Sequence, residues 1–234
     1  MKKSTFLQPI NGLTAAMAMA LLMTCLNANA SSLILNFGPT TGSSIQFNGS
    51  QDSFQFNPGN NGYQWYITSE TGGSSVVGLN GSVLNGPFSY GSSITTSGSG
   101  FSQVQSATVL GPLGHLVINN GPGDDLTGTI NWITIATYYV SVGVLNADVN
   151  VNLSNVSYSG SNPDLQTLKA NQPGIVDVSF QFLPGETLTQ LSTGTGPYTT
   201  SFSGTITTAV PEPASIALAG LGGLTLLLFR RQRK

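Results

Sequence analysis

The stretch INWITIATYYVSVGVLNADVNVNL, residues 130–153, carries the strongest structural signal in the chain. Apolar and polar side chains alternate along it, and a period of two predicts β-strands with one buried face. The first same-face set is Ile130, Trp132, Thr134, Ala136, Tyr138, Val140, Val142 and Val144. The second set is Leu145, Ala147, Val149, Val151 and Leu153, opposite Asn146, Asp148, Asn150 and Asn152. Because the parity changes between Val144 and Leu145, we expect a break there, either a β-bulge or a crossing between sheets.

Similar alternation covers much of the sequence on both sides of this stretch. The expected inward positions are Leu33, Leu35 and Phe37; Ile45 and Phe47; Phe54 and Phe56; Tyr63, Trp65 and Ile67; Val156 and Tyr158; Val176, Val178, Phe180 and Phe182; and Tyr198, Thr200, Phe202 and Ile206. Clusters of Gly, Pro and Asn separate the runs and mark turns. Short strands joined by turns predict an all-β fold, specifically an antiparallel β-sandwich of jelly-roll or immunoglobulin-like type.

One short helix is expected to begin at Asn162-Pro163. Asparagine is a good N-cap, and proline suits the first helical position because no N–H is needed there. Leu165 and Leu168 then share a face, and Pro173-Gly174 ends the helix. The remainder of this region is expected to be strand or turn.

Residues 31–208 are expected to form a single ectodomain, because 178 residues suffice for one hydrophobic core. Lys169 is its one basic residue. Its eight acidic residues are Asp52, Glu70, Asp124, Asp125, Asp148, Asp164, Asp177 and Glu186. With His115 neutral, one positive and eight negative charges give a net charge of −7. A surface so poor in positive charge cannot neutralise phosphates, which argues against nucleic acid as a partner.

The first 30 residues read as a secretory signal peptide. Lys2 and Lys3 precede an apolar run, residues 13–26, and Ala28 and Ala30 form an A-x-A site that predicts cleavage before Ser31 by signal peptidase. The alternative is a lipoprotein signal, because Leu22-Met23-Thr24-Cys25 resembles a lipobox. Cleavage after Ala30 removes Cys25, and the mature chain then has no cysteine for a disulfide or a thiolate site.

The last residues, 209–234, form a second targeting segment. Pro211, Glu212 and Pro213 predict an extended stretch, because proline fixes φ and disfavours helix in the residue before it. Residues 214–229 carry no charge and would make a helix of about 24 Å, slightly shorter than the ~30 Å hydrocarbon core of a membrane. The basic cluster that follows, Arg230, Arg231, Arg233 and Lys234, indicates a cytoplasmic end.

Pro-Glu-Pro, an apolar helix rich in Gly and Leu, and an Arg-rich end together resemble the PEP-CTERM sorting signal. The resemblance covers residues 210–234 only, and Gln232 interrupts the basic run. It implies recognition in the inner membrane of a Gram-negative bacterium by an exosortase, a membrane-embedded enzyme resembling cysteine transpeptidases. It also implies cleavage near Pro-Glu-Pro, transfer of the ectodomain to the cell surface or extracellular space, and frequent association with extracellular polysaccharide.

Motifs of catalytic sites are absent from the sequence, so we expect no catalytic residue, no cofactor, no resident metal and no enzymatic activity. His115 could serve a Ser-His-Asp triad, but nothing in the sequence fixes that geometry. Asp124 and Asp125 follow Gly121-Pro122-Gly123 and allow two sharper interpretations. One is a calcium ligand pair aided by Asn119 and Asn120, and the other is a glycosidase carboxylate; a solvated turn is preferred to both.

Aromatic residues offer one further site. The candidates for a sugar-stacking platform are Tyr63, Trp65, Tyr66, Trp132, Tyr138 and Tyr139. Most fall at inward parity and are expected in the core, which leaves Tyr66 and Tyr139 as the exposed pair. The preferred function is a structural or adhesive protein of the surface or extracellular matrix. The alternative is a carbohydrate-binding module, and a polysaccharide-degrading enzyme ranks third.

Overall fold

The computed structural model describes residues 32–139, 142–146 and 150–208, which belong to one compact unit. Its strands are β1 (Ile34–Pro39), β2 (Ser44–Asn48), β3 (Ser53–Asn57), β4 (Trp65–Thr71), β5 (Asn80–Leu84), β6 (Phe88–Tyr90), β7 (Thr95–Ser97), β8 (Val104–Gly111), β9 (Gly114–Asn119), β10 (Leu126–Ile130), β11 (Thr134–Tyr138), β12 (Val142–Leu145), β13 (Leu153–Ser157), β14 (Gly174–Gln181), β15 (Pro197–Thr200) and β16 (Phe202–Thr208). The helices are α2 (Pro163–Ala170) and α3 (Leu188–Thr193), with 3₁₀ turns η1 (Gly49–Gln51) and η2 (Gly100–Ser102).

Across these described ranges, none of the helices is both long enough and apolar enough to span a membrane. The predicted signal peptide, residues 1–30, and the predicted membrane helix, residues 214–229, lie outside the described residues.

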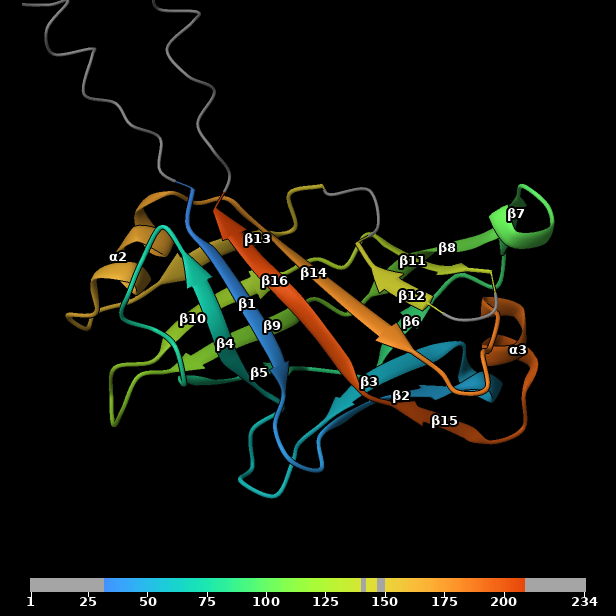
Figure 1. Cartoon of the computed structure of the whole chain (residues 1–234), viewed down its shortest axis with the longest axis horizontal. Helices are drawn as coiled ribbons and strands as arrows, with labels where there is room; N and C mark the ends of the chain where they lie inside the picture. The colour runs from blue at the N-terminus through green and yellow to red at the C-terminus, as the bar shows by residue number, and fades with distance from the viewer. Residues whose placement is uncertain (1–31, 140–141, 147–149, 209–234) are drawn as a thin grey trace, which may run out of the picture. The chain divides into compact units, whose positions relative to one another are not determined.

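Eight strands form a closed ring in the order β13-β10-β9-β5-β4-β1-β16-β14, and β13 pairs with β14 to close it. All of these pairings are antiparallel. In Figure 1, β1, β16 and β14 cross in front of β9 and β10. Buried side chains that these strands contribute to the core are Leu35, Ile67, Val83, Leu116, Ile118, Leu126, Ile130, Leu153, Val176 and Ile206.

A second group of strands continues from β14 in the order β12-β11-β8-β6-β3-β2-β15, with β7 paired to β8. Aromatic side chains attach this group to the ring. The Phe47 ring lies 4.9 Å from that of Phe180 on β14, and the Phe56 ring lies 5.1 Å from that of Phe202 on β16. The buried side chains of both groups form one hydrophobic core.

The structure confirms the expectation of an all-β, antiparallel fold. The finer prediction of a jelly-roll or immunoglobulin-like sandwich is not confirmed, because the strands follow one hydrogen-bonded order in which eight strands close into a ring. The reason lies in β14: one of its edges pairs with β13 at Gly174 and with β12 from Val178 to Gln181, so that this strand belongs to both groups.

Outside the central stretch, the alternation predicts burial well. The side chains of Leu33, Leu35, Phe37, Ile45, Phe47, Phe54, Phe56, Trp65, Ile67, Val156, Tyr158, Val176, Val178, Phe180, Phe182, Phe202 and Ile206 are buried as expected. Tyr63, Tyr198 and Thr200 are only partly buried. The period of two therefore identifies most of the core.

The central stretch itself is divided into shorter strands than predicted. Ile130, Trp132, Ala136, Leu145 and Leu153 are buried as expected. The inward prediction is wrong for Tyr138, Val142 and Val151, which are exposed, and for Thr134 and Val144, which are only partly buried. Ile135 and Thr137 are buried instead. The Thr137 hydroxyl accepts a hydrogen bond from Leu188 N of α3 at 2.9 Å, which explains why a polar residue faces inward and Tyr138 outward.

The break predicted between Val144 and Leu145 does not fall there, because β12 runs through both residues and pairs them in register with β11 and β14; the break lies one residue later. β12 ends at Leu145, and Asn146 adopts a positive φ of 59°, a conformation that asparagine tolerates better than most residues. The chain then crosses from β12 to β13, which belong to different groups of strands. Val140, Ala147, Asp148 and Val149 lie outside the described residues.

Asn146 and Asn152 were predicted to face solvent and are buried. The side chain of Asn152 bonds to both main-chain groups of Val176: Nδ2 donates to the carbonyl at 2.9 Å, and Oδ1 accepts from the N–H at 2.7 Å. This carboxamide extends the β13–β14 pairing beyond its main-chain partners, Leu153 and Gly174. Asn146 Nδ2 donates to Asn150 O at 2.8 Å. Both residues are buried because they satisfy backbone groups at the crossing.

The predicted helix is confirmed as α2. The Asn162 side chain accepts hydrogen bonds from Asp164 N and Leu165 N, and Leu165 and Leu168 are buried. The expectation of only one helix is wrong, because α3 follows. Its capping box joins Thr187 and Gln190, a Thr-x-x-Gln pattern that is visible in the sequence.

Candidate functional site

The residues predicted for sorting and processing all lie outside the described part of the chain. They are Ala28, Ala30, Pro211, Glu212, Pro213, Arg230, Arg231, Arg233 and Lys234. Their roles at this stage remain predictions from the sequence.

Asp124 and Asp125 lie in the exposed turn between β9 and β10. Asp124 N donates to Gly121 O at 3.1 Å, and Asp125 Oδ1 accepts from Asn119 Nδ2 at 2.9 Å. Asn120 Nδ2 donates to the Tyr158 hydroxyl at 2.8 Å. Within residues 32–208 as described, no group of three or more His, Cys, Asp and Glu side chains is placed to hold a metal.

His115 lies on β9 and is partly buried. Its cross-strand neighbours are Thr129 on β10 and Leu84 on β5. Neither neighbour is a serine or an aspartate, so the strand pairing does not assemble the triad considered from the sequence.

Tyr66 and Tyr139 are exposed as predicted, by 40% and 36%. They do not form one platform, because β1, β16, β14 and β12 separate β4 from β11 in the strand order. The ring of Tyr139 lies instead 4.7 Å from that of Phe101. Tyr138, predicted to be inward, is 40% exposed, while Trp65 and Trp132 are in the core as expected.

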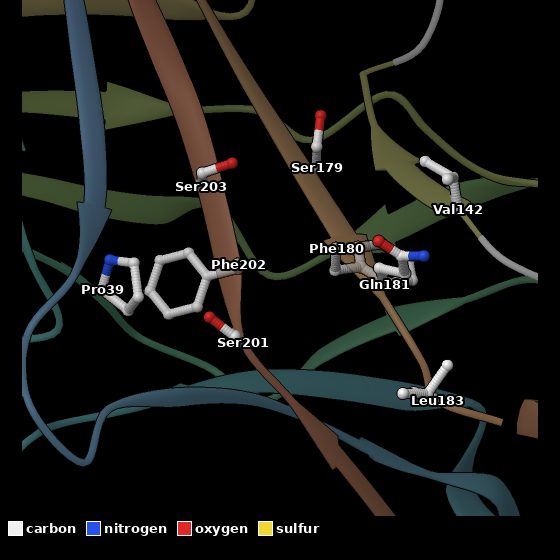
Figure 2. A pocket seen from close by; sticks show the side chains of 9 residues that line it. All are labelled: Pro39, Val142, Ser179, Phe180, Gln181, Leu183, Ser201, Phe202 and Ser203. Carbon is white, nitrogen blue, oxygen red and sulfur yellow. The ribbon is translucent and has the colours of Figure 1, made fainter. Parts of the chain in front are cut away.

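A groove of about 520 Å³ lies over the outward face of β14 and β16, between the end of β1 and the start of β12. Ser179 of β14 is directly opposite Ser203 of β16, as Figure 2 shows, and Gln181 and Ser201 lie further along the same strands. The apolar walls come from Pro39, Val142 and Leu183.

The groove is hollow because the outward side chains at its centre are small. Beneath them the inward neighbours Phe180 and Phe202 are each only 3% exposed. These two rings pack against Phe47 and Phe56 of the second group of strands. The floor of the groove therefore rests on a packed aromatic core.

The electrostatic character of the groove is neutral. Its lining offers serine hydroxyls, which both donate and accept, and one carboxamide from Gln181, but no charged side chain. The nearest acidic residue along β14 is Asp177, whose pKa is raised by burial despite a hydrogen bond from Asn146 Nδ2 at 3.4 Å. This lining suits an uncharged ligand rich in hydroxyl groups.

The groove is not recognisable from the sequence alone, because its residues come from four strands. The available signal was local: on β14 the small or polar residues Asp177, Ser179 and Gln181 alternate with buried apolar ones. That pattern indicates a polar outer face, but only the strand pairing shows that Ser179 meets Ser203 and that β1 and β12 form the walls.

Comparison with protein-family models matches residues 209–234 to the PEP-CTERM protein-sorting motif. No curated protein and no solved structure matches the chain. The match covers the tail, which contains Pro211, Glu212, Pro213 and the basic cluster that the sequence resemblance rested on. The chain is therefore an exported protein that carries a PEP-CTERM sorting motif, the signal by which exosortase substrates are sorted.

Proposed function

We propose that this protein is a structural or adhesive component of the cell surface or extracellular matrix of a Gram-negative bacterium. Signal peptidase removes residues 1–30, and residues 214–229 hold the chain transiently in the inner membrane. An exosortase then acts near Pro211-Glu212-Pro213 and releases the domain, residues 31–208, toward the surface. In this proposal the protein has no enzymatic activity and needs no cofactor or metal.

The observation that carries the proposal is the PEP-CTERM motif at residues 209–234, directly after a compact all-β unit. Such a motif belongs to proteins that are exported and held in a membrane before display. The all-β unit supports a structural role, because its large aromatic core gives a stable body with polar outer strand faces. The net charge of −7 over residues 31–208 also favours solubility outside the cell.

A comparison of host cells with and without the gene tests this role. We expect the protein to be accessible to a membrane-impermeant label on intact cells, and cells without it to lose matrix cohesion or surface attachment. A Glu212→Ala variant, which keeps the apolar helix and the basic cluster, is expected to remain unprocessed in the inner membrane. Unchanged cohesion and attachment after deletion of the gene would contradict the structural role.

The groove over β14 and β16 favours a second candidate, a carbohydrate-binding module. Its volume falls within the range of ligand sites, roughly 300–1,000 Å³, and its hydroxyl and amide lining matches the hydrogen-bonding groups of sugars. Binding of a labelled extracellular polysaccharide to the purified protein tests this candidate.

A further inference from the structure

We infer that the groove is the centre of a longer surface that binds an extended segment of neutral polysaccharide, with Tyr66 and Tyr138 at its two ends. This inference rests on the carbohydrate-binding candidate and assigns its site and its ligand class.

The two tyrosines are placed by the strand pairing. Tyr138 of β11 is opposite Val142 of β12, and Val142 forms one wall of the groove. At the other end, Tyr66 of β4 is opposite Gly38 of β1, which precedes the wall residue Pro39. Both tyrosines are 40% exposed, so each presents part of its ring to solvent.

The length of this surface points to a chain rather than a small molecule. From β4 to β11 the strand order is β4-β1-β16-β14-β12-β11, which makes five steps between neighbours. At ~4.8 Å per step the tyrosines lie up to about 24 Å apart, less where the sheet curves. An extended oligosaccharide that crosses the strands can contact both ends and the groove at once.

The chemistry of the surface selects carbohydrate over peptide. In this part of the sheet β14 and β16 pair with each other from Gly174 to Phe180, and an added peptide strand needs an unpaired edge. The face instead presents the hydroxyl and carboxamide groups of Ser179, Ser203 and Gln181 between apolar walls, with one exposed tyrosine beyond each end of the groove. Sugar rings present hydroxyls at their rims and apolar C–H faces, which fit hydrogen-bonding side chains and exposed aromatic rings respectively.

The charge of the groove and of the domain around it favours neutral over acidic carbohydrates. The groove lining is uncharged, and the region 31–208 has a net charge of −7 with Lys169 as its one basic residue. Lys169 Nζ is engaged by the carbonyl of Tyr158 at 2.9 Å, next to α2. Like charges repel, so uronate-rich or sulfated chains are disfavoured and neutral chains are favoured.

Calorimetric titration of the full chain, purified in detergent, tests the inference. The probes are cellohexaose and maltohexaose as neutral oligosaccharides, and an oligogalacturonate of equal length as the acidic comparison. We expect at least one neutral probe to bind, with an affinity insensitive to salt, and the oligogalacturonate to bind at least tenfold more weakly.

Variants locate the site. Tyr66→Ser and Tyr138→Ser are each expected to weaken binding about fivefold, in line with the loss of one aromatic stacking contact. Ser179→Tyr fills the groove and is expected to abolish binding; tyrosine suits an exposed strand position. If Ser179→Tyr does not fold, Ser203→Gln serves as a second filling variant. Leu113→Ser, at a 54% exposed position outside the groove lining, is the matched control and should bind like wild type.

The inference is overturned if no neutral probe binds, if the filled variants bind normally, or if the oligogalacturonate binds as well as the neutral probes. These results are distinct from failure of the surface role. If a neutral probe binds but the filled variants bind as well as wild type, the groove inference fails and the carbohydrate-binding candidate stands; if no probe binds, both fail. A protein retained in the inner membrane overturns the surface role alone.

Discussion

Replacing Asp164 with asparagine is expected to destabilise the domain strongly, although the change is nearly isosteric. Asp164 is the second residue of α2 and is only 7% exposed. Its Oδ2 atom accepts hydrogen bonds from Ser74 N at 2.9 Å, Ser75 N at 2.7 Å and Ser75 Oγ at 2.6 Å. One carboxylate thus attaches the connection between β4 and β5 to the N-terminus of α2.

The magnitude follows from these contacts. A hydrogen bond to a charged group contributes about 1.5–3 kcal/mol, and a negative charge at a helix N-terminus adds about 0.3–1 kcal/mol. Asparagine keeps one acceptor oxygen but loses the charge, so the free energy of unfolding should fall by about 2–3 kcal/mol. At ~2–4 °C per kcal/mol for a domain of this size, the Tm should fall by roughly 4–12 °C.

The effect should depend on pH. Burial acts to raise the pKa of Asp164, but the hydrogen bonds from Ser75 and Ser74 outweigh it, and the net effect lowers the pKa below its usual value. A carboxyl with a lowered folded-state pKa stabilises the fold above its unfolded pKa of about 3.9, and this contribution is lost as pH falls through the folded-state pKa. The difference between wild type and Asp164→Asn should therefore be largest near pH 7 and shrink below about pH 4.

Chemical denaturation at several pH values, followed by tryptophan fluorescence, measures this difference. Asp125→Asn is the control, because that carboxylate is exposed and accepts one hydrogen bond from Asn119; it should change stability by less than about 0.5 kcal/mol. Gly73→Ala should act like Asp164→Asn, since an added Cβ would lie 2.5 Å from Asp164 Cγ. A change below about 0.5 kcal/mol for Asp164→Asn, or a difference that does not vary with pH, would refute the reasoning.

Two further predictions concern the crossing between β12 and β13. Burial raises the pKa of Asp177, so the folded state binds a proton more readily than the unfolded chain, and stability should fall as pH rises from about 4 through the folded-state pKa. Asp177→Asn should remove that decline and raise the free energy of unfolding at pH 7, measured by the same denaturation; a less stable variant at pH 7 would contradict this. Asn152→Ala leaves both main-chain groups of Val176 without their side-chain partners and should cost about 2–4 kcal/mol, with faster amide exchange at Val176. Exchange at Val176 as slow as in wild type would show that the carboxamide is not needed to close the ring.

The fold could be predicted from the sequence where burial follows local alternation. At β1, Leu33 just before the strand and Leu35 and Phe37 within it show the period of two directly, and all three are buried. The signals at Asn162 and Pro163 likewise identified α2, because helix capping is a property of adjacent residues.

The alternation failed where a distant partner decides the direction of a side chain. Thr137 faces inward because it accepts a hydrogen bond from Leu188, 51 residues later in the chain. Asn152, just before β13, is buried because its carboxamide forms hydrogen bonds with the main chain of Val176 on the neighbouring strand β14. Polarity predicts exposure only when no buried backbone group is available as a partner.

The candidate sites also differ in whether adjacent residues are enough to identify them. The sorting motif is contiguous in sequence, and its match at residues 209–234 confirms the resemblance. The groove depends on the register that sets Ser179 against Ser203 and on the walls from Pro39 and Val142, none of which are neighbours in the chain. Tyr138 was assigned to the wrong face for the same reason, since its exposure follows from the pairing of β11.

The mass of the protein recovered from the cell surface tests the central claim most directly. Intact-mass spectrometry of the protein from wild-type cells should show a chain that begins at Ser31 and ends near Pro211-Glu212-Pro213, without the basic cluster. Cells lacking the exosortase should hold a longer form in the inner membrane, one that still ends at Lys234. A protein that ends at Lys234 in both strains, and stays in the inner membrane of both, would contradict the account and leave a plain membrane anchor.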